Sequence, residues 1–196
     1  MGVRSLKLQK AVFLDRDGVI IRQVDFLIKP RQLKLLPNVG KVIKLLNHFG
    51  FLVVVITNQP VIARGLIKPE GIDKIHTILI NRLKKQGAKI DAVYFCPHHP
   101  NANVKKYRLR CRCRKPGIGM ITKAAKDLNI NLKKSFMIGD ALIDIVAGKR
   151  AGLTSILVKT GPGHSRLDKL YKKNFRPDFI AKNLNEVIRI IKKYGK

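Results

Sequence analysis

The chain alternates between short apolar runs and longer stretches in which apolar residues recur every three or four positions. The runs are rich in valine, isoleucine and phenylalanine, which is typical of strands buried on both faces. They predict strands at residues 11–14, 51–56, 92–95, 136–138 and 155–158, and we expect a last short strand at 178–181.

The stretches between these runs have the spacing of helices with one buried face. One such helix is predicted from Ile72, Ile75, Ile78, Leu79 and Leu83, and another, amphipathic, at the C-terminus. The alternation of strands and helices predicts an α/β protein with a parallel sheet and helices on both faces. With 196 residues we expect one domain over 1–196, with a surface loop at 159–177.

Polar side chains directly follow three of the predicted strands. The carboxyl ends of parallel strands meet at one edge of a sheet, so these residues should share one crevice. The first strand is followed by Asp15 and Asp17, the second by Thr57, Asn58 and Gln59, and the fourth by Asp140, with Asp144 one helical turn later. This edge of the sheet is therefore the candidate site.

Several carboxylates that converge in one crevice repel one another unless a hard cation neutralises them, and Mg²⁺ with oxygen ligands is the natural choice. A cation held by Asp15 and Asp140 would leave one oxygen of Asp15 for in-line attack on a phosphoryl group. Asp17 would protonate the leaving oxygen and later activate water. For Asp144, support of the metal from behind its ligands and a plain charge at a helix N-terminus both stay open.

Other residues of this edge suit the same chemistry. Thr57 and Asn58 offer a hydroxyl, an amide and backbone donors to phosphoryl oxygens. Lys115 can supply the fixed positive charge that the transition state requires. Gly18 suits a chain that must turn tightly beside the metal.

Four segments together resemble the motifs of the haloacid dehalogenase superfamily of aspartate-nucleophile phosphatases. They are residues 12–18, 56–59, 113–116 and 137–140, the last with Asp144, and they cover most of the chain. The resemblance implies a Rossmann-like core, a covalent aspartyl-phosphate on Asp15 and acid and base catalysis by Asp17. It also implies that Mg²⁺ is held by Asp15, the backbone carbonyl of Asp17 and Asp140.

Three cysteines and a histidine bracket a loop at about 96–113. The four are Cys96, His98, Cys111 and Cys113. They form a soft ligand set that suits a closed tetrahedral zinc site. A disulfide between Cys111 and Cys113 would be strained by their closeness. We therefore predict a structural Zn²⁺ that pins the loop, and the adjacent His99 could exchange roles with His98.

The loop with these four residues, the zinc loop, resembles that of particular phosphatases within the superfamily. Cys-x-His, a long basic loop and then Cys-x-Cys-Arg-Lys-Pro resemble the D-glycero-D-manno-heptose 1,7-bisphosphate 7-phosphatases, together with residues 62–65. Histidinol-phosphate phosphatases carry a related, shorter loop, so histidinol phosphate or another sugar phosphate is an alternative substrate. The resemblance implies no large cap domain, so the zinc loop and the segment after Asp17 shape the pocket entrance. It also implies that the substrate is contacted by Thr57, Asn58, Gln59, Arg114 and Lys115.

The sequence departs from this family at the pocket. Ala141 stands where the family usually has a basic residue, and Pro60 and Val61 stand in place of serine and glycine. Residues 23–26 replace a polar stretch that contains glycine and tyrosine. The predicted catalytic residues are intact, and these changes bear on the identity of the substrate.

The chain has 41 Lys and Arg against 12 Asp and Glu, a formal net charge of +29. Such a charge attracts polyanions, which fits a phosphorylated substrate or a nucleic acid, and a lysine-rich host proteome explains it equally. Two other functions stay open, a polynucleotide 3′-phosphatase and a non-enzymatic, zinc-stabilised nucleic-acid-binding module. The basic residues that would serve them are Lys105, Lys106, Arg108, Arg110, Arg112 and Arg114.

The location of the protein is predicted from two further features. No apolar run approaches the roughly 20 residues that span a bilayer, and the basic start lacks the apolar stretch of a secretory signal. Three cysteines are too few for a disulfide scaffold and suit a reducing compartment. We expect a soluble, cytoplasmic protein that is a monomer.

Overall fold

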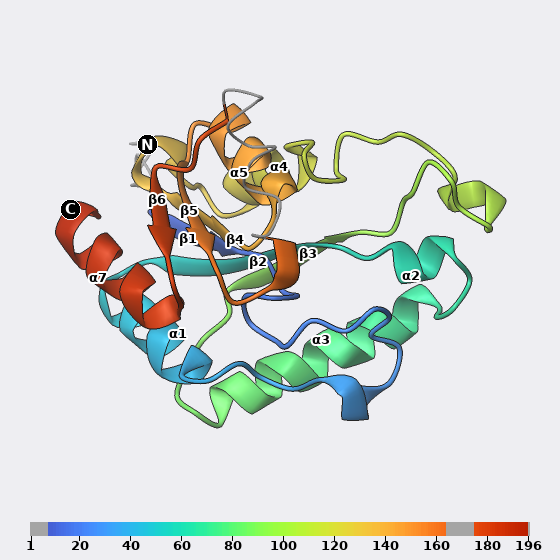
Figure 1. The fold of residues 1–196 in the computed structure, drawn as a ribbon, viewed down its shortest axis with the longest axis horizontal. Coiled ribbons are helices and arrows are strands. Elements are labelled where there is room, and N and C mark those ends of the chain that lie inside the picture. Colours follow the sequence, from blue (N-terminus) through green and yellow to red (C-terminus); the bar gives the residue numbers. More distant parts are fainter. Residues whose placement is uncertain (1–7, 164–174, 196) are drawn as a thin grey trace, which may run out of the picture.

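The computed structural model describes residues 8–163 and 175–195, in which one six-stranded sheet is formed (Figure 1). All neighbouring strands are parallel, in the order β3-β2-β1-β4-β5-β6. The strands are β1 (Ala11–Leu14), β2 (Leu52–Asn58), β3 (Ala92–Cys96), β4 (Phe136–Gly139), β5 (Thr154–Val158) and β6 (Phe179–Ala181). Strand order reverses between β1 and β4, which is where open α/β sheets bind ligands.

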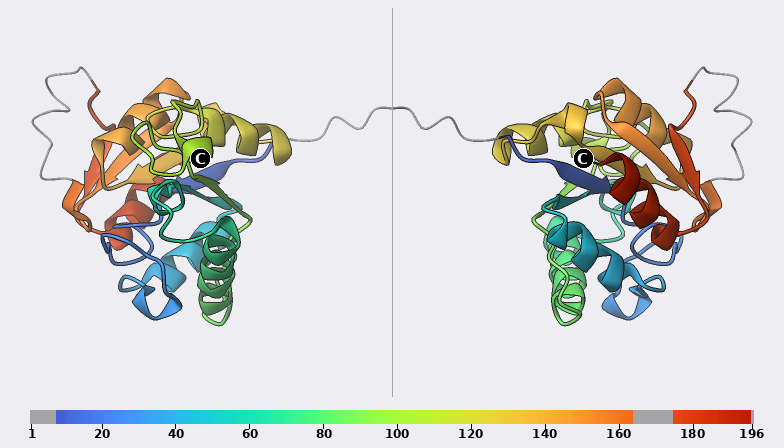
Figure 2. Two further views of the ribbon diagram at one scale, coloured as in Figure 1. Left: turned by 90° about the vertical axis from the view of Figure 1, so that its right-hand side faces the viewer. Right: turned by 90° about the vertical axis from the view of Figure 1, so that its left-hand side faces the viewer.

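Helices cover both faces of this sheet, as the two side views in Figure 2 show. One face carries α1 (Val39–His48), α3 (Pro69–Lys84) and α7 (Leu184–Tyr194), and the other carries α4 (Gly119–Asp127) and α5 (Leu142–Arg150). A short helix, α2 (Pro60–Ala63), follows β2, and single 3-10 turns lie at Pro30–Gln32, Lys105–Tyr107 and Leu132–Lys134. The predicted α/β architecture is confirmed.

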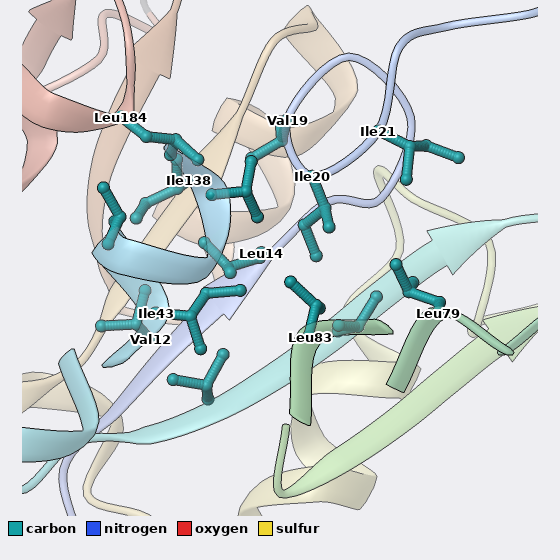
Figure 3. Close-up of a cluster of buried hydrophobic side chains, with 14 of the residues drawn as sticks. Val12, Leu14, Val19, Ile20, Ile21, Ile43, Leu79, Leu83, Ile138 and Leu184 are labelled. Carbon is teal, nitrogen blue, oxygen red and sulfur yellow. The ribbon is translucent and has the colours of Figure 1, made fainter. Parts of the chain in front are cut away.

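The side chains of β1 alternate between two buried clusters. Val12 and Leu14 belong to the larger cluster, with Ile43 of α1 and Leu79 of α3 (Figure 3). Phe13 belongs to the smaller cluster under α4 and α5. Burial of one such side chain contributes about 1.5–3 kcal/mol, so the central strand that carries the candidate site is firmly anchored on both faces.

The predicted strands agree with the observed ones to within two residues at each end. One expectation was wrong. The run at 92–95 was expected to be buried on both faces, but residues 92–95 of β3 are only half-buried because β3 is an edge strand. Its position at the edge depends on which strands pair, and the composition of the run does not reveal that.

Three further predictions concern the surface loop at 159–177, a cap domain and membrane-spanning helices. Part of the predicted surface loop at 159–177, namely 164–174, lies outside the described residues. Within the described ranges, no separate cap domain is inserted between the elements of the sheet. No helix in these ranges is both long enough and apolar enough to cross a membrane.

Candidate active site

A pocket of about 620 Å³ opens at the carboxyl ends of β1, β2 and β4. The strand register brings these ends together, since Leu14 is paired with Val55 of β2 and with Ile138 of β4. The structure thus gathers residues from all four motifs around one pocket. Its lining includes Asp15, Asp17, Thr57, Asn58, Gln59, Arg114, Lys115, Asp140 and Asp144.

Lys115 is buried between two carboxylates of this pocket. Its Nζ lies 2.7 Å from Asp15 Oδ1 and 2.7 Å from Asp144 Oδ1, and it donates to the carbonyl oxygen of Ile56 at 2.9 Å. Burial lowers the pKa of the Lys115 ammonium, but the carboxylates of Asp144 and Asp15 outweigh burial and raise the pKa above its ordinary value. The side chain is therefore a fixed positive charge.

The three carboxylates around Lys115 are difficult to ionise together. Burial raises the pKa of Asp15 to about 7 in spite of the opposing charge of Lys115. Burial, and then the charge of Asp15, raise the pKa of Asp140 to about 6. Burial also raises the pKa of Asp144. One ammonium group does not balance three carboxylates, so the site favours an additional cation.

The donor set fits Mg²⁺. Oxygens of Asp15, Asp140 and Asp144 lie within 4.8 Å of one another, and small hard cations take carboxylate oxygens as ligands. Asp144 also stands in the first turn of α5, where its Oδ2 accepts a hydrogen bond from the backbone N–H of Ala141 at 3.1 Å. The structure therefore places Asp144 both close to the other two carboxylates and at a helix N-terminus.

Two glycine-containing turns enclose Asp140. Gly18 has a φ of 80°, and a Cβ atom there would lie 2.7 Å from Asp140 Oδ2. A Cβ atom on Gly161 would lie 2.0 Å from the same oxygen, to which the N–H of Gly163 donates at 3.2 Å. The hydroxyl of Thr160 joins the two turns through the carbonyl oxygen of Gly18, at 2.6 Å. Only residues without a side chain allow the backbone this close to Asp140.

Asp17 lines the same pocket and is hydrogen-bonded to Arg16 and Gln59. Its Oδ2 accepts hydrogen bonds from Arg16 Nη2 at 2.9 Å and from Gln59 Nε2 at 3.0 Å. Its side chain keeps 21% of its surface exposed, which leaves it within reach of a ligand in the pocket. Its side-chain oxygens are not among those gathered with Asp15 and Asp140, so only its backbone carbonyl could serve the metal as the resemblance implies.

The polar residues at the end of β2 bond mainly within the protein. Asn58 forms a reciprocal pair with the backbone of Lys115, to which its Nδ2 donates at 3.1 Å and from which its Oδ1 accepts at 3.0 Å. Gln59 Nε2 donates to Thr57 Oγ1 at 2.8 Å, and Gln59 Oε1 accepts from Arg16 at 2.8 Å. Both amide groups therefore hold the site together, and the Thr57 hydroxyl keeps its hydrogen for a ligand.

The four predicted zinc ligands meet where β3 ends. Cys96 is the last residue of β3, and the ligand atoms of the four side chains lie within 4.8 Å of one another. Cys113 Sγ lies 3.0 Å from Cys96 Sγ and 3.4 Å from His98 Nδ1. Burial raises the pKa of the Cys96 thiol. Three sulfurs and one imidazole this close together fit a soft cation with tetrahedral coordination, as predicted.

His99 lies outside this cluster. Its Nδ1 accepts a hydrogen bond from the backbone N–H of Asn101 at 3.1 Å. The structure thus places His98, and not its neighbour, with the three thiols. The cluster also orients the third motif, because the Arg114 N–H donates to Cys111 Sγ at 3.4 Å and Arg114 Nη1 donates to the His98 carbonyl at 3.2 Å.

The positions that depart from the family pattern also face the pocket. Phe26 is the exception, since its ring lies against the guanidinium of Arg64, 4.8 Å from the ring centroid. The other departing positions line the pocket together with Leu142 and Ile143, and this part of the lining is partly apolar. These positions are Gln23, Val24, Asp25, Pro60, Val61 and Ala141.

Two site residues were not predicted from the sequence. Arg16 is fully buried and contacts Asp17, Gln59 and His76. His76 lies on α3 with its Nε2 3.0 Å from Arg16 Nη1. The sequence did contain a signal for His76, because it falls four residues after Ile72 on the apolar face of that helix.

Known proteins share this sequence pattern. A HAD-hydrolase-like family model matches residues 112–187. A D-glycero-beta-D-manno-heptose-1,7-bisphosphate 7-phosphatase from Rhodopseudomonas palustris is 41% identical over 149 residues, which is 76% of this chain and 83% of that one. A D-glycero-D-manno-heptose-1,7-bisphosphate 7-phosphatase from Chlorobaculum tepidum is 35% identical over 185 residues, 91% of this chain and 92% of that one. The resemblance stated from the motifs is confirmed.

A solved structure agrees with these relatives. The crystal structure of a D,D-heptose 1,7-bisphosphate phosphatase from B. bronchiseptica, complexed with magnesium and phosphate, matches this chain with a TM-score of 0.81 and 31% identity. The match covers 94% of this chain and 98% of that one. Since nearly the whole of both chains aligns, the predicted Rossmann-like architecture is confirmed.

Proposed function

The chain belongs to the HAD-like family of the D-glycero-D-manno-heptose 1,7-bisphosphate 7-phosphatases, and we propose that it removes the 7-phosphate of that sugar bisphosphate. The observation that carries the proposal is the placement of Asp15, Asp17 and Lys115 around one pocket. This pocket provides a nucleophile, an acid and base, and a fixed positive charge. A binding module without catalysis would need none of the three.

In the first step, an oxygen of the Asp15 carboxylate attacks phosphorus in line with the leaving sugar oxygen. The new bond joins phosphorus to Asp15, and the bond between phosphorus and the sugar oxygen breaks. Asp17 donates its proton to that oxygen, which leaves as a hydroxyl group. Lys115 and the Thr57 hydroxyl stabilise the charge that develops on the phosphoryl oxygens.

In the second step, Asp17 takes a proton from a water molecule. The water oxygen attacks phosphorus, the bond from phosphorus to Asp15 breaks, and inorganic phosphate leaves. Asp17 is again protonated and Asp15 again a carboxylate, so the cycle closes. The two aspartates have separate tasks because Asp15 is paired with Lys115 and Asp17 with Arg16 and Gln59.

Mg²⁺ would be held by the carboxylates of Asp15 and Asp140 and the backbone carbonyl of Asp17, with Asp144 behind them. When bound, it supplies positive charge that draws the phosphoryl oxygens toward the nucleophile. The oxygen donors within 4.8 Å of one another and the raised pKa values of Asp15 and Asp140 support this assignment.

Zn²⁺ is the ion we propose for Cys96, His98, Cys111 and Cys113. Its role would be structural, because four protein ligands leave no open position. It would fix the loop that leads into Arg114 and Lys115, which supports recognition of the substrate by Arg114. The hydrogen bonds from Arg114 to Cys111 and His98 support this link.

The domain organisation, oligomeric state and location of the enzyme are proposed as well. We propose a single domain over residues 1–196 that acts as a monomer on a small sugar phosphate. A cytoplasmic location is proposed with it, since Cys96, Cys111 and Cys113 form no disulfide, and cysteines without disulfides are typical of a reducing compartment.

Phosphate release by the purified protein with Mg²⁺ tests the function. The substrates are heptose 1,7-bisphosphate, histidinol phosphate and an oligonucleotide with a 3′-phosphate, and Asp15→Asn is the control. We expect one phosphate per bisphosphate molecule, with ³¹P NMR showing that the 1-phosphate remains, and no release by Asp15→Asn. Preference for histidinol phosphate or the oligonucleotide would overturn the substrate, and release by Asp15→Asn would overturn the nucleophile.

A further inference from the structure

A buried arginine stands between the two catalytic aspartates of the first motif. Arg16 is 1% exposed and among the largest fully buried side chains of the described residues. Its Nη2 donates to Asp17 Oδ2 at 2.9 Å and to Gln59 Oε1 at 2.8 Å, and its Nη1 lies 3.0 Å from His76 Nε2. Three elements, the loop after β1, the end of β2 and α3, therefore meet at one guanidinium group.

The hydrogen bond to His76 has a defined direction. A guanidinium group carries only donors, so His76 Nε2 must accept and the ring must be neutral, with its hydrogen on Nδ1. Burial, and then the charge of Arg16, lower the pKa of His76 to about 3. His76 is thus a permanent acceptor at neutral pH.

Packing alone does not account for this arginine. Arg16 Nε finds no hydrogen-bond partner among the described residues, and an unsatisfied buried donor costs about 1–3 kcal/mol. An apolar side chain of similar size would avoid that cost and the cost of a buried charge. The arrangement is therefore better explained by what the guanidinium holds than by the stability it adds.

Gln59 closes the network on its other side. Its Oε1 accepts from Arg16 and its Nε2 donates to Asp17 Oδ2 at 3.0 Å. The Asp17 carboxylate is thereby held by two donors that approach from different elements. Neither donor can rotate freely, since Arg16 is also bound to His76 and Gln59 is also bound to Thr57 Oγ1 at 2.8 Å.

We infer that His76, acting through Arg16 and Gln59, is a positioning residue that fixes the orientation of the Asp17 carboxylate. The inference rests on the proposed function, in which Asp17 transfers protons to and from the reacting oxygens. His76 touches neither substrate nor metal ligands in this scheme. Its effect is on proton transfer, because an acid displaced by about 1 Å can cost about 100-fold in rate.

Heptose 1,7-bisphosphate and p-nitrophenyl phosphate, an artificial phosphate ester, differ in their need for a general acid. A sugar oxygen leaves poorly unless Asp17 protonates it, whereas the p-nitrophenolate of p-nitrophenyl phosphate leaves without a proton. Formation of the aspartyl-phosphate from p-nitrophenyl phosphate therefore does not depend on proton donation by Asp17. Its later hydrolysis still needs Asp17, so a misplaced Asp17 shows as a rapid burst of p-nitrophenol followed by slow turnover.

His76→Leu removes the acceptor, and His76→Gln restores one through its side-chain carbonyl. For His76→Leu we expect the rate of phosphoryl transfer from heptose 1,7-bisphosphate to fall about 10-fold to 100-fold with little change in KM. The burst rate with p-nitrophenyl phosphate should stay within about 2-fold, and His76→Gln should recover most of the loss. Should His76→Leu fold poorly, Arg16→Lys gives the same test, since one ammonium group cannot reach Asp17, Gln59 and His76 together.

Leu79→Ala is the matched control on the same face of α3, because Leu79 is fully buried and has no part in the network. It should lower stability and leave the ratio of the two rates unchanged. Equal loss on both substrates in His76→Leu, or the same selective loss in Leu79→Ala, would overturn the inference while the proposed function stands. A wild-type protein inactive on both esters would overturn the proposed function, and this inference with it.

Discussion

The ammonium nitrogen of Lys115 lies 2.7 Å from a carboxylate oxygen of Asp15, although the two residues stand in different halves of the chain. The contact joins two of the motif segments, residues 113–116 and residues 12–18. It is kept in place from behind by Asn58, which holds the backbone of Lys115 at both its N–H and its carbonyl. Asp15, the proposed nucleophile, is therefore paired with a counter-charge before any substrate arrives.

Lys115→Met should remove that charge with two effects. Turnover should fall by about 10³-fold, because the developing charge on the phosphoryl group loses its fixed partner. Stability near neutral pH should fall by about 3–5 kcal/mol, because Asp15 and Asp144 stay buried without a counter-ion. Steady-state kinetics and urea unfolding measure the two effects.

A double variant separates the two effects. Adding Asp144→Asn to Lys115→Met removes one uncompensated carboxylate and should recover part of the stability and none of the activity. A Lys115→Met protein as stable as the wild type would contradict the view that Lys115 balances these carboxylates.

Gly161→Ala should weaken Mg²⁺ binding. The new methyl group would stand 2.0 Å from Asp140 Oδ2 unless the turn or the carboxylate moved. A displaced carboxylate should lower Mg²⁺ affinity by about 10-fold or more, which titration calorimetry can measure without turnover. Gly71→Ala, at the start of α3, is the control, since its new methyl group meets only the flexible side chain of Ile67. Equal Mg²⁺ affinity in all three proteins would refute the prediction.

Acid should destabilise the fold through His76. Its pKa is about 3 in the folded protein against 6.5 ordinarily, so below about pH 6.5 the unfolded chain takes up a proton that the folded chain refuses. Stability from this group is complete above that pH and falls by about 2 kcal/mol between about pH 7 and pH 5. His76→Gln lacks this contribution.

The difference in unfolding free energy between wild type and His76→Gln, followed over that pH range, isolates the effect of His76. The subtraction is needed because the raised pKa values of Asp15 and Asp140 act in the opposite direction: their folded forms bind protons more readily than the unfolded chain does. A difference that does not vary with pH would show that His76 titrates normally.

Zinc content should depend on the thiols. Purified protein should hold about one zinc per chain by elemental analysis, and Cys111→Ser should lose it. A loss of about 3 kcal/mol would lower Tm by about 6–12 °C in a domain of this size. His99→Ala should keep both zinc and Tm, because His99 lies outside the cluster. Zinc-free wild-type protein, or unchanged zinc in Cys111→Ser, would refute the assignment.

The parts of the molecule that depend on local pattern were predictable from the sequence. The bounds of β1 and β4 follow from buried apolar runs, and the parallel direction of the strands follows from the alternation with helices. That β1 and β4 are neighbours, which places Asp15 beside Asp140, is shown by the structure. The cluster of Cys96, His98, Cys111 and Cys113 could also be predicted, since their spacing leaves few other uses for three thiols and an imidazole.

Properties set by tertiary contacts were not predictable. The resemblance implies that Gln59 contacts the substrate, and the structure places Gln59 in the pocket lining, but the hydrogen bonds of its amide to Arg16 and Asp17 were not predicted. Its orientation depends on the burial of Arg16, which depends in turn on the acceptor at His76, sixty positions away. No local spacing encodes such a chain of contacts.

Asp15 and Asp140 are neighbours in space and distant in the order of synthesis. β1 is made first among the strands, and its neighbour β4 leaves the ribosome only after more than two thirds of the chain. Until then, one edge of β1 has no partner, and an unpaired edge invites pairing with other chains. A truncated product that ends before β4 would therefore lack Asp140 and expose an unpaired edge of β1, so the position of one strand makes synthesis through β4 a condition for solubility as well as for the assembly of the carboxylate site.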